Sequence, residues 1–166
     1  MLKFAKGQRG FTLVELVIVI MITGILVVIG SRILTAGYNS YLASRYLIAA
    51  DAQARVALER IQRDVRAIRS PSDITTASSS QLVFVNTSGN TITYSLSGTS
   101  LKRQTNANTS QILADGIQSL TLSYFDLNGA ATAILANIRY ITISLNVVLN
   151  NTNFTASTSV YPRNLP

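Results

Sequence analysis

Residues 11–30 read FTLVELVIVIMITGILVVIG, an apolar stretch of twenty residues whose one charged side chain is Glu15. Twenty helical residues rising about 1.5 Å each span roughly 30 Å, which matches the hydrocarbon core of a bilayer. A charge near the centre of a membrane helix costs roughly 2.5 to 3.5 kcal/mol, so such residues normally have a partner and a function. The stretch therefore predicts a membrane-spanning helix with a carboxylate that needs a partner.

A basic leader of ten residues precedes this stretch. It carries Lys3, Lys6 and Arg9 and no acidic residue. Basic residues next to a membrane helix favour a cytoplasmic position, so we expect the N-terminus in the cytoplasm and the rest of the chain across the membrane. The formal net charge of the chain is +7, and it falls to +4 without the three leader charges.

The composition argues against several classes of enzyme chemistry. The 166 residues include no cysteine and no histidine. The sequence therefore lacks the commonest general base, the Cys/His and Ser/His nucleophile systems, and the usual ligands of zinc and copper. We expect a non-enzymatic protein with no catalytic residue, no cofactor and no metal site.

Residues 6–15, KGQRGFTLVE, closely resemble the prepilin motif of type IV pilins and type II secretion pseudopilins. The resemblance implies that a membrane peptidase cuts on the cytoplasmic side between Gly10 and Phe11 and then N-methylates Phe11. It also implies that Glu15 meets the terminal amine of a neighbouring subunit during filament assembly, which would offset the cost of burying both charges. A removable secretory signal ending at Gly30 and a simple uncleaved anchor are the alternatives.

Proline is absent from the helix that this stretch begins, and the first proline is Pro71. Major pilins commonly carry a proline near the far end of the apolar stretch, where this chain has Arg32, so a locally melted helix is less expected despite Gly24. Residues 54–69 and 92–103 also resemble, more loosely, the J-type minor pseudopilins and the W-type minor pilins. The resemblance therefore favours a minor subunit over the main component of a fibre.

An amphipathic helix is predicted to continue from residue 31 to residue 69. Apolar residues recur at spacings of three or four and form one stripe, which consists of Leu47, Ala50, Ala54, Leu58, Ile61, Val65 and Ile68. The helix should stop near Ser70, because Pro71 disfavours helical geometry in the residue before it. A helix from Phe11 to Arg69 would be roughly 90 Å long.

The polar side of that helix carries Arg55, Arg63, Arg66 and Arg69, with Glu59 among them. Three oppositely charged pairs lie four residues apart, Arg55/Glu59, Glu59/Arg63 and Arg60/Asp64, and each exposed pair adds about 0.2 to 0.5 kcal/mol. Clustered arginines also suit contacts with nucleic-acid phosphates. The interleaved acids and the scarcity of aromatic residues favour a solvated or subunit-facing stripe, and nucleic acid is the disfavoured partner.

Short runs that alternate apolar and polar residues follow residue 80 and predict strands. The runs are 82–85, 92–96, 120–124, 141–147 and 154–160, with tight hairpins at residues 88–90 and 97–99. One face of the resulting antiparallel sheet would cover the apolar stripe of the helix. The predicted fold class is therefore α+β and pilin-like: a long N-terminal helix, transmembrane in its first half, packed against a C-terminal antiparallel β-sheet.

Four parts follow from this fold. They are the cleaved leader at residues 1–10, the transmembrane half of the helix at 11–30, its periplasmic amphipathic half at 31–69 and the sheet domain at 70–166. Within that last part, residues 126–129 superficially resemble the start of a calcium loop, and the family includes subunits that bind calcium in this region. Calcium takes roughly six to eight oxygen ligands. The acidic residues after residue 70 are only Asp73, Asp115 and Asp126, which are too few for such a site, so a hairpin turn is favoured.

These features together predict a minor pilin or pseudopilin, a structural and assembly subunit of a type IV pilus or a type II secretion pseudopilus. Its expected partners are the prepilin peptidase and methyltransferase, other pilin or pseudopilin subunits, the assembly platform with the secretin, and the lipid bilayer. We expect a single-pass protein of the bacterial inner membrane with its C-terminal domain in the periplasm. The alternative is a membrane-anchored periplasmic module that binds protein or DNA and is not incorporated in a filament.

Overall fold

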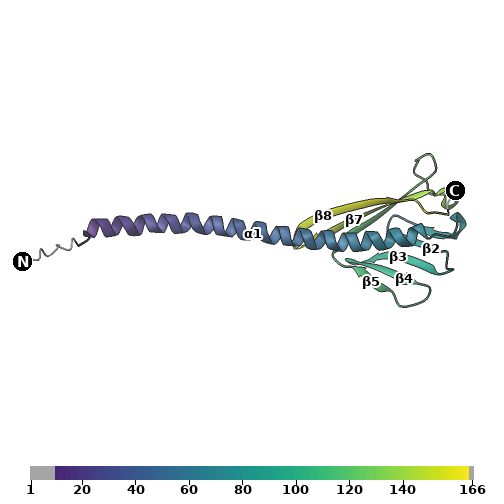
Figure 1. The fold of residues 1–166 in the computed structure, drawn as a ribbon, viewed down its shortest axis with the longest axis horizontal. Helices are drawn as coiled ribbons and strands as arrows, with labels where there is room; N and C mark the ends of the chain where they lie inside the picture. The colour runs from purple at the N-terminus through teal and green to yellow at the C-terminus, as the bar shows by residue number, and fades with distance from the viewer. Residues whose placement is uncertain (1–9, 165–166) are drawn as a thin grey trace, which may run out of the picture. The chain divides into compact units, whose positions relative to one another are not determined.

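The computed structural model describes residues 10–164. Within them one α-helix, α1 (Leu13–Arg66), precedes eight β-strands and two single-turn 3-10 helices, Pro71–Asp73 and Leu135–Asn137 (Figure 1). The chain divides into two units, residues 1–42 and residues 43–166, which we call the N-terminal and the C-terminal unit. The first part of α1 belongs to the N-terminal unit, and the rest of α1 and all strands belong to the C-terminal unit.

Helix α1 is continuous over 54 residues. It passes without a break through Gly24, Gly30 and Gly37, and no proline occurs in it. A glycine in a helix interior costs only about 1 kcal/mol, whereas a proline costs about 3 kcal/mol and removes a hydrogen bond. The expectation that this helix has no melted region is therefore confirmed.

The predicted apolar stripe of the helix is buried in the C-terminal unit. Five of its residues, and Ala57, which was not predicted, make six with exposed fractions of 1% or less: Ala50, Ala54, Ala57, Ile61, Val65 and Ile68. Leu58 is half-buried, whereas Leu47 is 44% exposed, so the buried stripe begins about one turn later than predicted. Three of the six are alanines, whose small side chains let the strands approach the helix closely.

Helix α1 ends at Arg66, slightly before its predicted end at Arg69. The backbone that follows bonds to the sheet instead of continuing the helix. The Arg69 N–H donates to the Val85 carbonyl at 3.1 Å, and the Thr87 N–H donates to the Ala67 carbonyl at 2.8 Å. These sheet contacts replace the last helical turn that the sequence predicts.

The first sheet has five antiparallel strands in the order β1-β2-β3-β4-β5. Their bounds are β1 Ile74–Ala77, β2 Gln81–Val85, β3 Thr91–Ser97, β4 Ser100–Thr105 and β5 Gln111–Ala114. Gly89 and Gly98 have φ angles of 78° and 61° in the turns on either side of β3, a conformation that glycine adopts without a steric cost. Both predicted hairpins are therefore confirmed.

Strands β1, β4 and β5 are not predicted by the sequence pattern. Each of them buries a single side chain, Ile74, Leu101 and Ala114 respectively. One buried residue in a strand of four to six residues gives no alternation of apolar and polar positions. These strands are held chiefly by their backbone pairing with longer neighbours.

The second sheet has three antiparallel strands in the order β6-β7-β8. Their bounds are β6 Ile117–Phe125, β7 Tyr140–Leu149 and β8 Thr152–Val160. In β7 the alternation is complete, and its four inward residues are fully buried: Ile141, Ile143, Leu145 and Val147. The predicted sheet is thus divided into two sheets, joined by a hydrogen bond from the Leu122 N–H to the Ser79 carbonyl at 2.8 Å.

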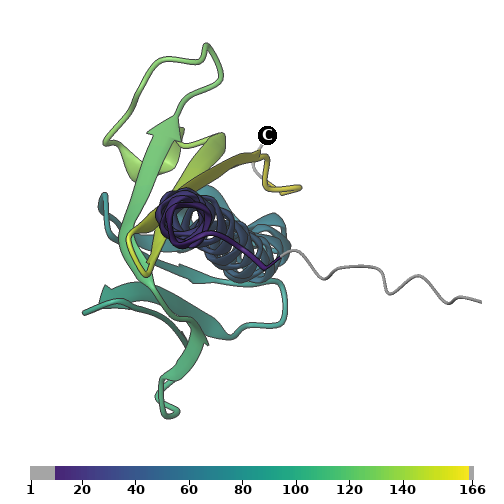
Figure 2. The ribbon, with the colours of Figure 1, turned by 90° about the vertical axis from the view of Figure 1, so that its left-hand side faces the viewer.

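Buried side chains from α1 and from both sheets form one hydrophobic core. The strands curve around one side of the helix in Figure 2. Phe84 of β2 and Tyr94 of β3 are the largest fully buried side chains of this core. The α+β, pilin-like fold class is therefore confirmed, with the C-terminal part of α1 packed against antiparallel sheets.

Candidate functional site

The side chain of Thr12 caps the N-terminus of helix α1. The Thr12 Oγ1 atom accepts a hydrogen bond from the backbone N–H of Glu15 at 3.2 Å, and the Thr12 carbonyl accepts one from the N–H of Leu16 at 3.2 Å. A threonine at this position satisfies an N–H group that the first turn of a helix leaves without a partner inside the helix. The cap therefore sets where the helix begins and puts Glu15 in its first turn.

The Glu15 carboxylate has no counter-charge in the described chain. Between residues 10 and 164 it makes no ion pair and no side-chain hydrogen bond. The positive end of the helix dipole stabilises a carboxylate in the first turn by about 0.3 to 1 kcal/mol. This interaction offsets only part of the cost of placing a charge in a membrane helix, which is roughly 2.5 to 3.5 kcal/mol at the centre of the bilayer. The carboxylate is thus available to a cation from another chain.

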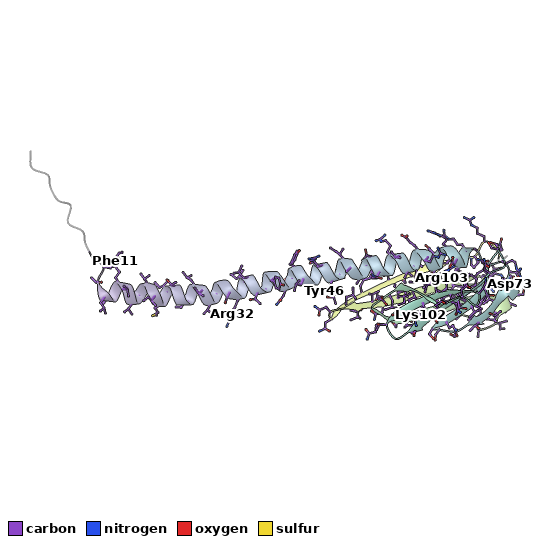
Figure 3. All side chains as sticks on the ribbon, turned by 90° about the horizontal axis from the view of Figure 1, so that it is seen from below. Phe11, Arg32, Tyr46, Asp73, Lys102 and Arg103 are labelled. Atoms are coloured by element: carbon purple, nitrogen blue, oxygen red, sulfur yellow. The ribbon has the colours of Figure 1, made fainter. Side chains whose placement is uncertain are left out.

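The peptide between Gly10 and Phe11 precedes the helix. Residues 10–12 have neither helical nor strand structure, and Phe11, labelled at the beginning of α1 in Figure 3, is 82% exposed. A methyl group added at Gly10 would meet no heavy atom within 4 Å. The described chain therefore leaves this peptide open to another protein. The leader residues Lys3, Lys6 and Arg9 lie outside the described residues.

The apolar side chains that follow Phe11 are all exposed. Their exposed fractions include 54% for Val17, 63% for Ile20 and 61% for Leu26. An 18-residue window of α1 near the N-terminus has a mean hydropathy of 2.9, and none of it is buried. By length and composition α1 can therefore cross a membrane, although a signal sequence passes the same test.

In the C-terminal unit, a polar cluster joins α1 to the first sheet. The Asp64 Oδ2 atom accepts hydrogen bonds from the Tyr94 hydroxyl at 2.7 Å and from the Arg103 Nε at 2.6 Å, and the Arg60 Nε lies 3.6 Å away. Burial, with the neighbouring Asp64 carboxylate as a further cause, raises the pKa of Tyr94 well above its ordinary value. We call Arg60, Asp64, Tyr94 and Arg103 the Asp64 cluster.

The Asp64 cluster holds α1 to the first sheet through hydrogen bonds to β3 and β4. The Arg60/Asp64 pair is predicted by its spacing of four residues, whereas Tyr94 and Arg103 are not, because they are 30 and 39 residues from Asp64 in the sequence. Charged and phenolic side chains on separate elements leave no local signal. The hairpin of β3 and β4 puts Tyr94 opposite Arg103, and the shared core of α1 and this sheet brings both beside Asp64.

Some arginines of α1 form other ion pairs than the sequence predicts. Arg55 pairs with Asp51 at 3.4 Å instead of Glu59, and just beyond the helix Arg69 pairs with Asp73 at 2.6 Å. The predicted Glu59/Arg63 pair is absent from the ion pairs of residues 10–164. Arg63 and Arg66 therefore have no carboxylate partner in this part of the chain.

Residues 126–129 form a turn, as the sequence favours. The Asp126 Oδ1 atom accepts hydrogen bonds from the N–H groups of Asn128 and Ala130, each at 2.9 Å, and Gly129 has a φ of 80°. These bonds occupy the carboxylate in shaping the turn. Among the described residues, no three or more His, Cys, Asp or Glu side chains group as metal ligands would.

Residues 5–31 match the family model of the prokaryotic N-terminal methylation motif. No curated protein matches the chain. The matched range contains Gly10, Phe11 and Glu15, and it extends over the apolar part of α1. Together with the pilin-like fold, the motif supports a type IV pilin-like precursor. It implies processing by a prepilin peptidase and partners of the pilin type, and the apolar helix is consistent with membrane anchoring.

Proposed function

We propose that this chain is a minor pilin or pseudopilin, a non-enzymatic subunit that is incorporated into a filament through helix α1. The observation that carries the proposal is the Glu15 carboxylate, which has no partner between residues 10 and 164 and lies in an exposed apolar helix within the matched methylation motif. An unpaired charge in such a helix is costly until an opposite charge meets it.

In this proposal the peptidase hydrolyses the Gly10–Phe11 peptide. Water adds one oxygen to the Gly10 carbonyl carbon, giving a carboxylate, and a proton to the Phe11 nitrogen, giving an amine. That amine then takes a methyl group from a sulfonium donor, which leaves as a thioether, and the nitrogen loses a proton. Access to this peptide is supported by its position before the helix, by the exposure of Phe11 and by the open space around Gly10. Processing thus places a cation at the tip of the apolar helix.

The cationic amine of one subunit then pairs with the Glu15 carboxylate of its neighbour. Because Thr12 already caps the first turn, the carboxylate is not needed to satisfy the helix and is available between subunits. Association removes two unpaired charges from the bilayer at once, so the charge pair favours the register in which amine and carboxylate meet. Residues 11–30 span the inner membrane and the C-terminal unit faces the periplasm.

Arg32 supports the minor role. It lies near the position at which major pilins commonly carry a proline, and helix α1 is continuous at Arg32. A helix without that break suits a subunit that primes or caps assembly.

The absence of native cysteine allows a direct test of incorporation. A Leu16→Cys variant, expressed in the native cell and treated with a thiol oxidant, should form disulfide-linked products with neighbouring subunits that carry a cysteine at the position equivalent to Thr12, because the proposed register offsets neighbours by four residues. Adding Glu15→Gln should abolish these products, whereas adding Asp51→Asn in the C-terminal unit should leave them unchanged. A Glu15→Gln chain that crosslinks as well as its parent would instead support a membrane-anchored binding module.

A further inference from the structure

Three arginines without carboxylate partners meet at one place in the C-terminal unit. Arg63 and Arg66 lie in the last turns of α1. Arg163 is distant from them in the sequence, because it follows β8. Their guanidinium groups make no ion pair and no side-chain hydrogen bond between residues 10 and 164, and all three side chains are exposed. By contrast, the neighbouring Arg55 and Arg60 are each paired with an aspartate.

The three arginines line one open cavity of about 650 Å³. Thr87, from the turn after β2, and Asn164 complete its wall. Backbone bonds hold the wall together: the Arg163 N–H donates to the Arg66 carbonyl at 3.3 Å, and the Thr87 N–H donates to the Ala67 carbonyl at 2.8 Å. The Asn164 side chain also donates to the Ile68 carbonyl at 3.1 Å. We call this space the arginine cavity.

The charge of the arginine cavity is unbalanced. Among the described residues that line it, Glu59 is the one carboxylate, against three guanidinium groups. The C-terminal unit as a whole carries ten basic and six acidic residues, a net charge of +4, so half of this excess is at the cavity. Like charges gathered in one place repel one another, and an incoming anion relieves that repulsion. Planar guanidinium groups bind carboxylates in a bidentate manner.

We propose that the arginine cavity is a docking site for an acidic segment of a partner subunit, whose carboxylates pair with Arg63, Arg66 and Arg163. The proposal rests on the proposed function, because it assigns the partner to the same assembly. A second copy of this chain is the poorer occupant, since two C-terminal units with net charges of +4 repel each other.

A protein partner fits the arginine cavity better than nucleic acid. Between residues 55 and 66 of α1 the basic residues do not form a track, because Arg55 and Arg60 are each paired with an aspartate, whereas Arg63 and Arg66 line the cavity. No aromatic side chain occurs among the residues that line the cavity in the described chain. Single-stranded nucleic acid is usually held by stacking on aromatic residues along a basic groove.

The cavity is tested with the full chain in detergent micelles and a fluorescent polyglutamate peptide at physiological ionic strength. Replacing Arg63, Arg66 and Arg163 by glutamine should weaken peptide binding at least tenfold in fluorescence anisotropy. The matched control replaces Arg55, Arg69 and Lys102 by glutamine, which removes the same net charge from elsewhere and should change binding by less than threefold. Circular dichroism of both triple variants checks that they remain folded.

Three results would overturn the proposal. They are wild-type protein that does not bind polyglutamate, equal losses in the two triple variants, and duplex DNA that binds more tightly than the peptide in a cavity-dependent manner. Peptide binding does not require processing, so a Glu15→Gln chain should bind polyglutamate normally. In the native cell, a Thr87→Cys crosslink to a partner should disappear when the three cavity arginines are replaced, while the Leu16→Cys crosslink persists. A Leu16→Cys chain that keeps Glu15, binds polyglutamate and yet forms no crosslink would refute the proposed function and leave the cavity standing.

Discussion

The parts of helix α1 before and after Leu42 bury their apolar side chains differently. In the N-terminal unit, Val17 is 54% exposed and Ile25 is 52% exposed, although the sequence there is far more apolar. In the C-terminal unit, Ile61 is 1% exposed and Val65 is fully buried beneath the strands. Within residues 10–164, the chain thus covers the apolar side chains of one part only. The exposed apolar side chains of the other part are consistent with membrane anchoring.

The largest expected effect follows directly from this difference in burial. Ile61→Ala should lower the free energy of unfolding of the C-terminal unit by about 3 kcal/mol, because it leaves a cavity in the core. Val17→Ala should leave it unchanged within about 0.5 kcal/mol. Urea unfolding of the full chain in micelles, followed by tyrosine near-UV circular dichroism, measures both. If both variants lost the same free energy of unfolding, the two parts of α1 would not differ in how they bury their apolar side chains.

A second prediction compares two aspartates on the same helix. Asp64→Asn should destabilise the C-terminal unit by about 2 kcal/mol, because Arg103, whose side chain is 18% exposed, loses its counter-charge. Asp51→Asn removes only the partner of the exposed Arg55 and should cost less than about 1 kcal/mol. The same urea experiment distinguishes the two. A larger loss for Asp51→Asn would contradict the role assigned to the Asp64 cluster.

Tyr94 gives the next largest effect and a dependence on pH. Burial raises the pKa of Tyr94, so the folded state keeps its proton while an unfolded tyrosine loses it above a pH of about 10. Its contribution is complete below that pH and declines as the pH rises. Tyr94→Phe should cost about 1 kcal/mol at neutral pH and make the alkaline loss of stability shallower. An unchanged alkaline slope would show that Tyr94 ionises normally in the folded protein.

The smallest expected effect concerns Arg69 and Asp73. A hydrogen bond from the Arg69 guanidinium lowers the pKa of Asp73 below its ordinary value. The pair therefore stabilises the folded state above the ordinary aspartate pKa, and this contribution is lost as the pH falls through the lowered value. Because the Arg69 side chain is 54% exposed, Asp73→Asn should make little difference at neutral pH. Measuring the free energy of unfolding of the wild type and of Asp73→Asn as the pH falls should reveal a small difference between them. A large loss of stability in Asp73→Asn at neutral pH would contradict this small contribution.

The fold was largely accessible from local patterns. The apolar stretch, the stripe that includes Ile61 and Val65, and the alternation in β7 all repeat with the period of their own element. Strands such as β4 were not accessible, since a strand with one buried residue has no periodic signal. The division of the strands into two sheets and the early end of α1 also depend on long-range pairing, which local periodicity does not record.

The two candidate sites also differ in whether their residues lie close together in the sequence. Glu15 was found because one charge interrupts an apolar stretch, and the prepilin-like spacing lies within a single short segment. The arginine cavity was not found, although Arg63 and Arg66 were noted as part of a stripe. Its third cation, Arg163, is about a hundred residues away in the sequence, and only the folded chain brings it beside α1.

The intact mass of the protein purified from its native membranes tests the central claim most directly. The account predicts a chain that begins at Phe11, lacks the ten leader residues and carries one added methyl group on its terminal amine. A mass that still includes residues 1–10, with Phe11 unmethylated, would contradict it. In that case no terminal cation would exist to meet Glu15.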